Sequence, residues 1–114
     1  MDYQQNREYY RFLANYDCIY TIDTGNDIES FNATTYDISA GGVSIITKEN
    51  IIPTRETQIV IFLQDRDLKA HLKFVRCEAH EDDNYKLSFI FTDLEERDLK
   101  LLQDLCIKKQ LSSF

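Results

Sequence analysis

Two arginines near the start of the chain have the chemistry and the spacing to bind phosphate. Arg7 and Arg11 stand four residues apart in the segment Arg7-Glu8-Tyr9-Tyr10-Arg11. On a helical turn they would share one face, and on a loop they could approach a ligand from two sides. Each guanidinium is a planar fork of N–H donors, which matches a pair of phosphate oxygens better than a lysine does. Surface arginines near a terminus are also commonly just solvated, so the pair alone defines no site.

A second candidate element is the segment Asp37-Ile38-Ser39-Ala40-Gly41-Gly42. Asp37 and Ser39 are two residues apart, so on extended backbone both side chains project to one face. A carboxylate with a hydroxyl beside it could accept hydrogen bonds from the N–H and NH2 edge of guanine. Gly42 would allow a ring or a phosphate to approach the backbone closely. Aspartate, serine and glycine also make ordinary turns, and that interpretation stays open here.

Six runs of apolar and β-branched residues predict the strands that must position these side chains. Two of the runs change phase, near Tyr36 and near Phe74, as a β-bulge would cause. A bulge helps a short sheet to curl onto itself, so the sequence predicts a small closed barrel. The six runs are 18–22, 30–38, 43–47, 58–63, 68–79 and 85–91.

The chain ends differently, with Leu99, Leu102, Leu105 and Cys106 at helical spacing. Thr92-Asp93-Leu94-Glu95 has the spacing of a capping box, which predicts a helix beginning at Asp93. The expected fold is mainly β: a six-stranded antiparallel barrel with a C-terminal helix and a flexible N-terminal arm. We expect one domain over residues 1–114, with the arm at 1–15, the barrel at 16–92 and the helix at 93–111.

Together, the two motifs and the strand pattern resemble the PilZ domain family. Its signature is R-x-x-x-R, followed one strand later by D/N-x-S-x-x-G. Arg7 and Arg11 match the first element, and Asp37, Ser39 and Gly42 match the second, with no position substituted. The resemblance implies a six-stranded barrel that binds cyclic di-GMP. It implies that Arg7 and Arg11 clamp the phosphates and stack on guanine, that Asp37 and Ser39 contact guanine, and that Gly42 gives room. It also implies a receptor that changes conformation on binding nucleotide and signals through a protein partner.

Composition limits the other classes of function. The net charge is -7 and the pI about 4.7, which disfavours polymeric nucleic acid and membrane surfaces as partners. An anionic ligand then needs a local concentration of basic residues, so each arginine matters individually. Apart from the pair, these are Arg55, Arg66, Arg76 and Arg97.

Neither a disulfide framework nor a targeting segment is expected. Cys18, Cys77 and Cys106 are widely spaced, with no C-x-x-C pair, and are expected to be small buried hydrophobes in a reducing compartment. No apolar run has the length to cross a membrane, and residues 1–4 do not begin a signal peptide. We therefore expect a cytoplasmic location without membrane insertion.

No set of residues predicts an enzyme, a cofactor or a metal. His71 falls on a charged strand face, and His80 stands next to the acidic turn Glu81–Asp83 without a spaced set of ligands. Ser39 has no histidine near it in sequence and no nucleophile elbow. Two alternatives to a receptor remain: a PilZ-like adaptor that does not bind nucleotide, and a small barrel for single-stranded nucleic acid. The acidic balance disfavours the second of these.

Overall fold

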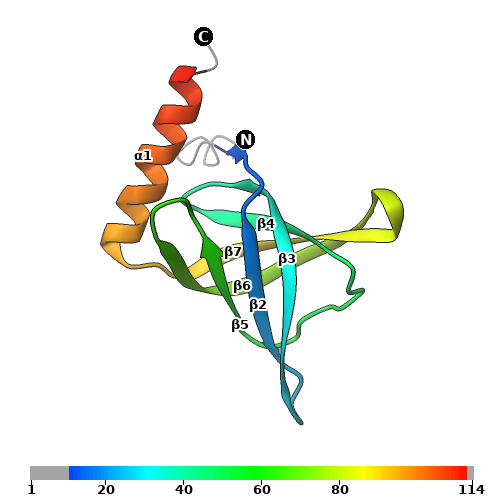
Figure 1. Cartoon of the computed structure of the whole chain (residues 1–114). Helices are drawn as coiled ribbons and strands as arrows, with labels where there is room; N and C mark the ends of the chain where they lie inside the picture. Colours follow the sequence, from blue (N-terminus) through cyan, green and yellow to red (C-terminus); the bar gives the residue numbers. More distant parts are fainter. Residues whose placement is uncertain (1–10, 113–114) are drawn as a thin grey trace, which may run out of the picture.

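Six antiparallel strands close into a barrel, and one short extra strand adds to it (Figure 1). The computed structural model describes residues 11–112, and side chains over residues 11–109. The barrel order is β3-β2-β5-β6-β7-β4, and β4 pairs back with β3 to complete the closure. The elements are β1 (Phe12–Leu13), β2 (Asp17–Asp23), β3 (Ile28–Ile38), β4 (Gly42–Thr47), β5 (Thr57–Phe62), β6 (Asp67–His80), the 3-10 turn η2 (Glu81–Asp83), β7 (Asn84–Asp93) and α1 (Glu96–Ser112). The predicted fold class and all six predicted strands are confirmed.

Alternate residues of each strand fill the barrel interior, as period-two patterning requires. Tyr20, Ile45, Ile61, Leu72 and Leu87 are fully buried. The phenol of Tyr20 is hydrogen-bonded to the hydroxyl of Thr47 at 2.8 Å, so its polar end is satisfied inside the core. Burial also raises the pKa of the Cys18 thiol to about 12, so this side chain stays a protonated, inert packing group.

Both predicted bulges are present in the strand registers. The β3–β4 register shifts between Thr35 and Asp37, and the β6–β7 register shifts between Phe74 and Arg76. A further shift between His71 and Leu72 was not predicted. The β6–β7 hairpin projects from the side of the barrel and ends in the η2 turn, the yellow loop of Figure 1. The first bulge lies beside Asp37, so it sets the direction in which that carboxylate points.

The strand β1 was not predicted, and it ties the end of the expected arm to the barrel. Phe12 pairs with Ile38 and Leu13 with Asp37, on the same edge of β3 that carries β2. Where the chain steps from β1 to β2, the buried Thr35 hydroxyl donates to the Ala14 carbonyl and accepts from the Tyr16 N–H at 2.8 Å. Residues 12–14 are therefore a fixed part of the sheet, whereas residues 1–10 lie outside the described part of the chain.

Substituting Thr35 with valine should destabilise the fold by about 1–3 kcal/mol, because the Ala14 carbonyl and the partly buried Tyr16 N–H lose their partner while side-chain volume is kept. A urea unfolding curve measures the change. Thr34→Val is the matched control, since Thr34 is half-buried and no hydrogen bond links it to the β1–β2 step. An equal loss in both variants would contradict this role for the Thr35 hydroxyl.

The C-terminal helix packs on the barrel by the predicted leucine stripe. Leu102 and Cys106 are buried, and Leu99 and Leu105 are half-buried against the core. Asp98, which is also buried, forms an ion pair with Arg66 just before β6. This pair joins the first turn of α1 to the barrel through a charge-assisted contact.

The predicted start of the helix was wrong. Asp93 is the last residue of β7 and pairs with His71 on β6. The N–H groups of Asp98 and Leu99 both donate to the Glu95 carbonyl at 2.9 Å, so the helix begins at Glu96. The Thr92 hydroxyl donates to Glu56 instead of capping the helix. Continued pairing with β6 overrides the local capping signal. No helix in the described part of the chain is long and apolar enough to cross a bilayer.

Candidate functional site

The two sequence motifs meet at one ion pair. The Nη1 atom of Arg11 lies 3.0 Å from the Oδ1 atom of Asp37, although 26 residues separate them. The Arg11 side chain is 54% exposed and that of Asp37 18% exposed. Pairing of β1 with β3 causes the approach, because Leu13 lies directly opposite Asp37. One arginine of the predicted pair is therefore at the aspartate, and Arg7 lies outside the described residues.

Ser39 uses its hydroxyl to build the turn between β3 and β4. Its Oγ atom accepts hydrogen bonds from the N–H groups of Gly41 at 3.1 Å and Gly42 at 3.2 Å. Its own N–H donates to the Gly42 carbonyl at 2.9 Å, and the residue is buried. The turn interpretation left open by the sequence therefore applies to Ser39. Its remaining capacity is the single O–H donor.

Gly42 is required by the packing of β4 on β7. A Cβ atom at this position would lie 2.3 Å from the carbonyl oxygen of Phe89, which is backbone and cannot swing aside. Gly42 pairs with Ile90, and the Phe91 N–H donates to the Gly41 carbonyl at 3.0 Å. The close approach that the glycine permits within the chain is thus that of a neighbouring strand. Room for a ligand at Gly42 remains a prediction.

A polar row runs from Asp37 across three further strands. Asp37 lies opposite Ser44 on β4, Ser44 opposite Ser88 on β7, and Ser88 opposite Arg76 on β6. Directly opposed residues point to the same face of a sheet. The chain neighbours of Ser44 and Ser88 fill the core, so the row faces away from the barrel interior, although both serines are themselves buried. The two serine hydroxyls are 2.9 Å apart and hydrogen-bonded. Asp37 and Arg76 are thus separated by three strand spacings, about 14 Å.

An aromatic and cationic cluster borders this row. The Nζ atom of Lys86 lies 4.7 Å from the centre of the Tyr36 ring, and the His80 ring meets Tyr36 edge-on at 5.7 Å. Lys86 also lies 3.7 Å from the Oε1 atom of Glu78, which accepts from Nε of Arg76 at 3.2 Å. Sequence reasoning did not identify Tyr36, Arg76 or Lys86 as site residues. Period two places Arg76 and Lys86 on the outer face, but it does not reveal which strands are neighbours.

The model of the PilZ domain family matches residues 5–108, which is most of the chain. The chain belongs to the PilZ domain family. No curated protein sequence matches it significantly.

Several solved structures share the fold at low sequence identity. The Bacillus subtilis inhibitor of motility MotI/DgrA is 20% identical with a TM-score of 0.80, and the match covers 93% of this chain and 52% of that one. YcgR from Escherichia coli, solved in complex with c-di-GMP, is 16% identical with a TM-score of 0.74 and coverages of 94% and 47%. The K. pneumonia MrkH–c-di-GMP complex is 18% identical with a TM-score of 0.71 and coverages of 90% and 52%. The chain spans about half the length of these proteins.

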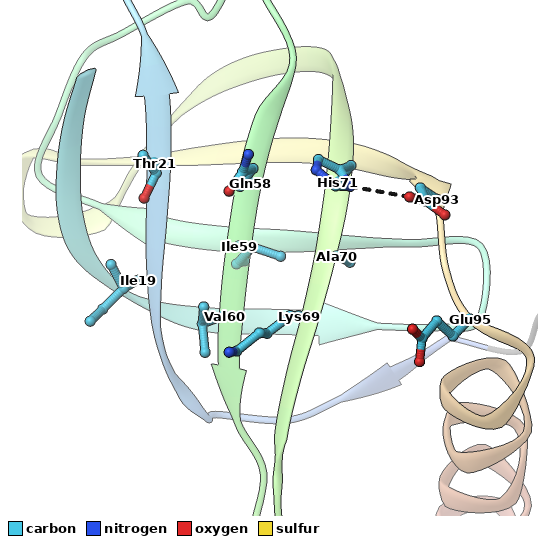
Figure 2. Close-up of a pocket in the computed structure, with 10 residues that line it drawn as sticks. All are labelled: Ile19, Thr21, Gln58, Ile59, Val60, Lys69, Ala70, His71, Asp93 and Glu95. Carbon is cyan, nitrogen blue, oxygen red and sulfur yellow. Dashed lines mark ion pairs between the residues drawn. The ribbon is translucent and has the colours of Figure 1, made fainter. Parts of the chain in front are cut away.

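Two open pockets mark different faces of this PilZ domain. One of about 390 Å³ borders the motif residues and is lined by Leu13, Ala14, Asn15, Tyr36 and Lys109. The other, of about 300 Å³, lies on the outer face of β2, β5 and β6 (Figure 2). Its side chains come in cross-strand rows, and Figure 2 shows Thr21, Gln58, His71 and Asp93 along one of them. None of Arg11, Asp37, Ser39 or Gly42 lines it.

The histidines serve local contacts in this PilZ domain. His71 lies on the outer face as expected but is half-buried, with its Nδ1 atom 3.4 Å from Asp93 Oδ2 (Figure 2). Within the described residues, no three side chains of His, Cys, Asp or Glu gather as a metal site would require. The candidate site is the motif surface, where Arg11 lies 3.0 Å from Asp37.

Proposed function

We propose that this PilZ domain is a receptor for cyclic di-GMP. The observation that carries the proposal is the 3.0 Å contact between Arg11 and Asp37, which brings both motifs to one surface. Family membership supports it, and so do the relatives YcgR and MrkH, whose structures were solved as complexes with c-di-GMP.

Each motif residue has a role that suits this ligand. Arg7 and Arg11 supply planar donors for phosphate oxygens and flat surfaces for guanine. The Asp37 carboxylate accepts from the N–H and NH2 edge of guanine, on the exposed side of the β3 bulge. Ser39 stabilises the turn that follows Asp37, and its hydroxyl can still donate one hydrogen bond. Gly42 allows β4 to approach the β7 backbone closely at the end of that turn.

The expected contacts supply enough free energy for micromolar binding of cyclic di-GMP, although the chain is acidic. A charge-assisted hydrogen bond contributes about 1.5–3 kcal/mol, and micromolar affinity needs about 8 kcal/mol. Two arginines, Asp37 and guanine stacking reach that sum after the cost of ordering the groups that bind. Screening over about 8 Å at physiological salt limits repulsion from the net charge of -7.

Calorimetric titration with cyclic di-GMP tests the proposal directly. Binding in the micromolar range or tighter is expected, because the guanidinium and carboxylate contacts act together. Cyclic di-AMP serves as the control ligand, since adenine lacks the N–H and NH2 edge that Asp37 would read. No heat and no thermal shift with cyclic di-GMP would leave the adaptor that does not bind nucleotide as the better description.

We further propose that binding changes the conformation of the arm and so alters contact with a protein partner. The described part of the chain holds a barrel and one helix, and their surfaces can relay a response by contact with another protein. Amide hydrogen exchange over residues 1–15 is expected to slow when the ligand contacts Arg7, Arg11 and Asp37 together. A pull-down with and without ligand would then identify the partner. Unchanged exchange at saturating ligand would contradict the conformational step alone.

A further inference from the structure

Arg76 and Lys86 point their charges at one carboxylate oxygen. The Oε1 atom of Glu78 lies 3.2 Å from Nε of Arg76 and 3.7 Å from Nζ of Lys86. Lys86 stands directly opposite Glu78 on β7, and Arg76 is two residues before Glu78 on β6. All three side chains therefore share the outer face of the hairpin. The two cations converge on a single anionic position.

Lys86 is held in place by its surroundings, whereas the Arg76 side chain is 60% exposed. The Lys86 ammonium rests against the Tyr36 ring at 4.7 Å, and its side chain is only 23% exposed. Arg76 sits at the end of the polar row that begins at Asp37. A cation packed against an aromatic face loses little freedom when it binds an anion. The pair is thus a ready anion site beside the proposed nucleotide site.

Glu78 is bound there as a charged carboxylate. The hydrogen bond from Arg76 lowers the pKa of Glu78, and the Lys86 charge acts in the same direction. The Glu78 side chain is nevertheless 46% exposed, and exposed ion pairs are weak because solvent screens them. An anion that makes further contacts with the domain can therefore replace the Glu78 carboxylate.

We propose that Arg76 and Lys86 form a phosphate subsite for the cyclic dinucleotide, and that Glu78 occupies this subsite until the ligand displaces it. The inference rests on the proposed function. A phosphate oxygen accepts from a guanidinium and an ammonium as a carboxylate oxygen does, and each phosphodiester of the ligand carries one negative charge, as Glu78 does. Glu78 thus lowers the affinity, while Arg76 and Lys86 raise it.

The two ends of the polar row have matching arrangements. Asp37 holds Arg11 at one end, and Glu78 holds Arg76 at the other. Each arginine has its charge balanced by a carboxylate within the chain. To bind either arginine, the ligand must displace the paired carboxylate or bind beside it. Its affinity therefore depends in part on the strength of the Arg11–Asp37 and Arg76–Glu78 ion pairs.

Titration of three variants with cyclic di-GMP tests the inference. Glu78→Gln should bind about threefold to tenfold more tightly than the unaltered chain, because the competing charge is gone and the size is kept. Arg76→Gln should bind about tenfold or more weakly, because a charge-assisted contact is lost. Glu29→Gln is the matched control: it removes the same charge from an exposed residue of β3 and should change affinity little.

The outcomes separate this inference from the proposed function. If the unaltered chain binds and Glu78→Gln binds no more tightly than Glu29→Gln, the subsite is wrong and the receptor stands. If the unaltered chain shows no binding but Glu78→Gln gains it, both stand. If neither binds, both are overturned. A weakened Arg76→Gln counts only if its thermal midpoint matches that of the unaltered chain.

Discussion

Replacing Arg11 with alanine is expected to weaken binding of cyclic di-GMP roughly 100-fold or more. The guanidinium can donate two charge-assisted hydrogen bonds to one phosphate, at about 1.5–3 kcal/mol each. The free energy of unfolding should hardly change, because an exposed ion pair such as Arg11–Asp37 contributes about 0–1 kcal/mol. Calorimetry measures the first quantity and urea unfolding the second.

Arg97→Ala is the matched control for Arg11→Ala. Arg97 is an exposed arginine paired with Glu95 at 3.1 Å, at the start of α1. It should leave affinity unchanged. Arg11→Lys should fall between the two, since an ammonium keeps the charge and loses the planar fork. Arg7→Ala should act like Arg11→Ala, and unchanged affinity in both would remove the arginines from the site.

Gly42→Ala is expected to destabilise the domain by about 2 kcal/mol or more, with no ligand present. Glycine to alanine within a strand ordinarily stabilises by about 0.5–1 kcal/mol, because it restricts the unfolded chain. Here the new Cβ would lie 2.3 Å from the Phe89 carbonyl oxygen, so β4 and β7 must separate. Overpacking of this kind costs about 1–3 kcal/mol. Thermal unfolding should show a midpoint lower by roughly 10 °C.

A second glycine gives the contrast for Gly42. Gly25 has a φ of 94°, and a Cβ there would meet only the flexible end of Arg55, at 3.4 Å. Gly25→Ala should cost about 1 kcal/mol through backbone strain alone, and it should leave nucleotide affinity intact. If Gly42→Ala were as stable as the unaltered chain and lost only affinity, the glycine would serve the ligand instead of the strand packing.

The strands and bulges could be predicted because their signals are local. Alternation of apolar residues marks each strand, and a change of phase marks the bulges beside Tyr36 and Phe74. The two residues of β1 are too few to show a period, and they are a strand only because β3 is beside them. The helix start failed for a related reason: pairing of Asp93 with His71 holds the capping-box residues in β7.

The site was predictable in part. The motifs assigned Arg11 and Asp37 to one candidate site, and the two side chains lie 3.0 Å apart, while their contacts with a ligand stay a prediction. They could not show that the Ser39 hydroxyl is engaged with the turn, since a hydroxyl suits a base and a backbone N–H equally. Arg76, Lys86 and Glu78 lie far from both motifs in sequence. Only the order of β3, β4, β7 and β6 brings them near Asp37.

The bulged outer half of β6 bears on self-association. From Lys73 to His80 this strand pairs with β7 and, in the described part of the chain, with no second strand. An unpaired edge is a template for aggregation, and charged side chains and bulges are common protection against it. Arg76, Glu78 and the bulge after Phe74 all lie on this stretch. Variants that neutralise those charges should therefore be checked by light scattering at the concentrations used for calorimetry.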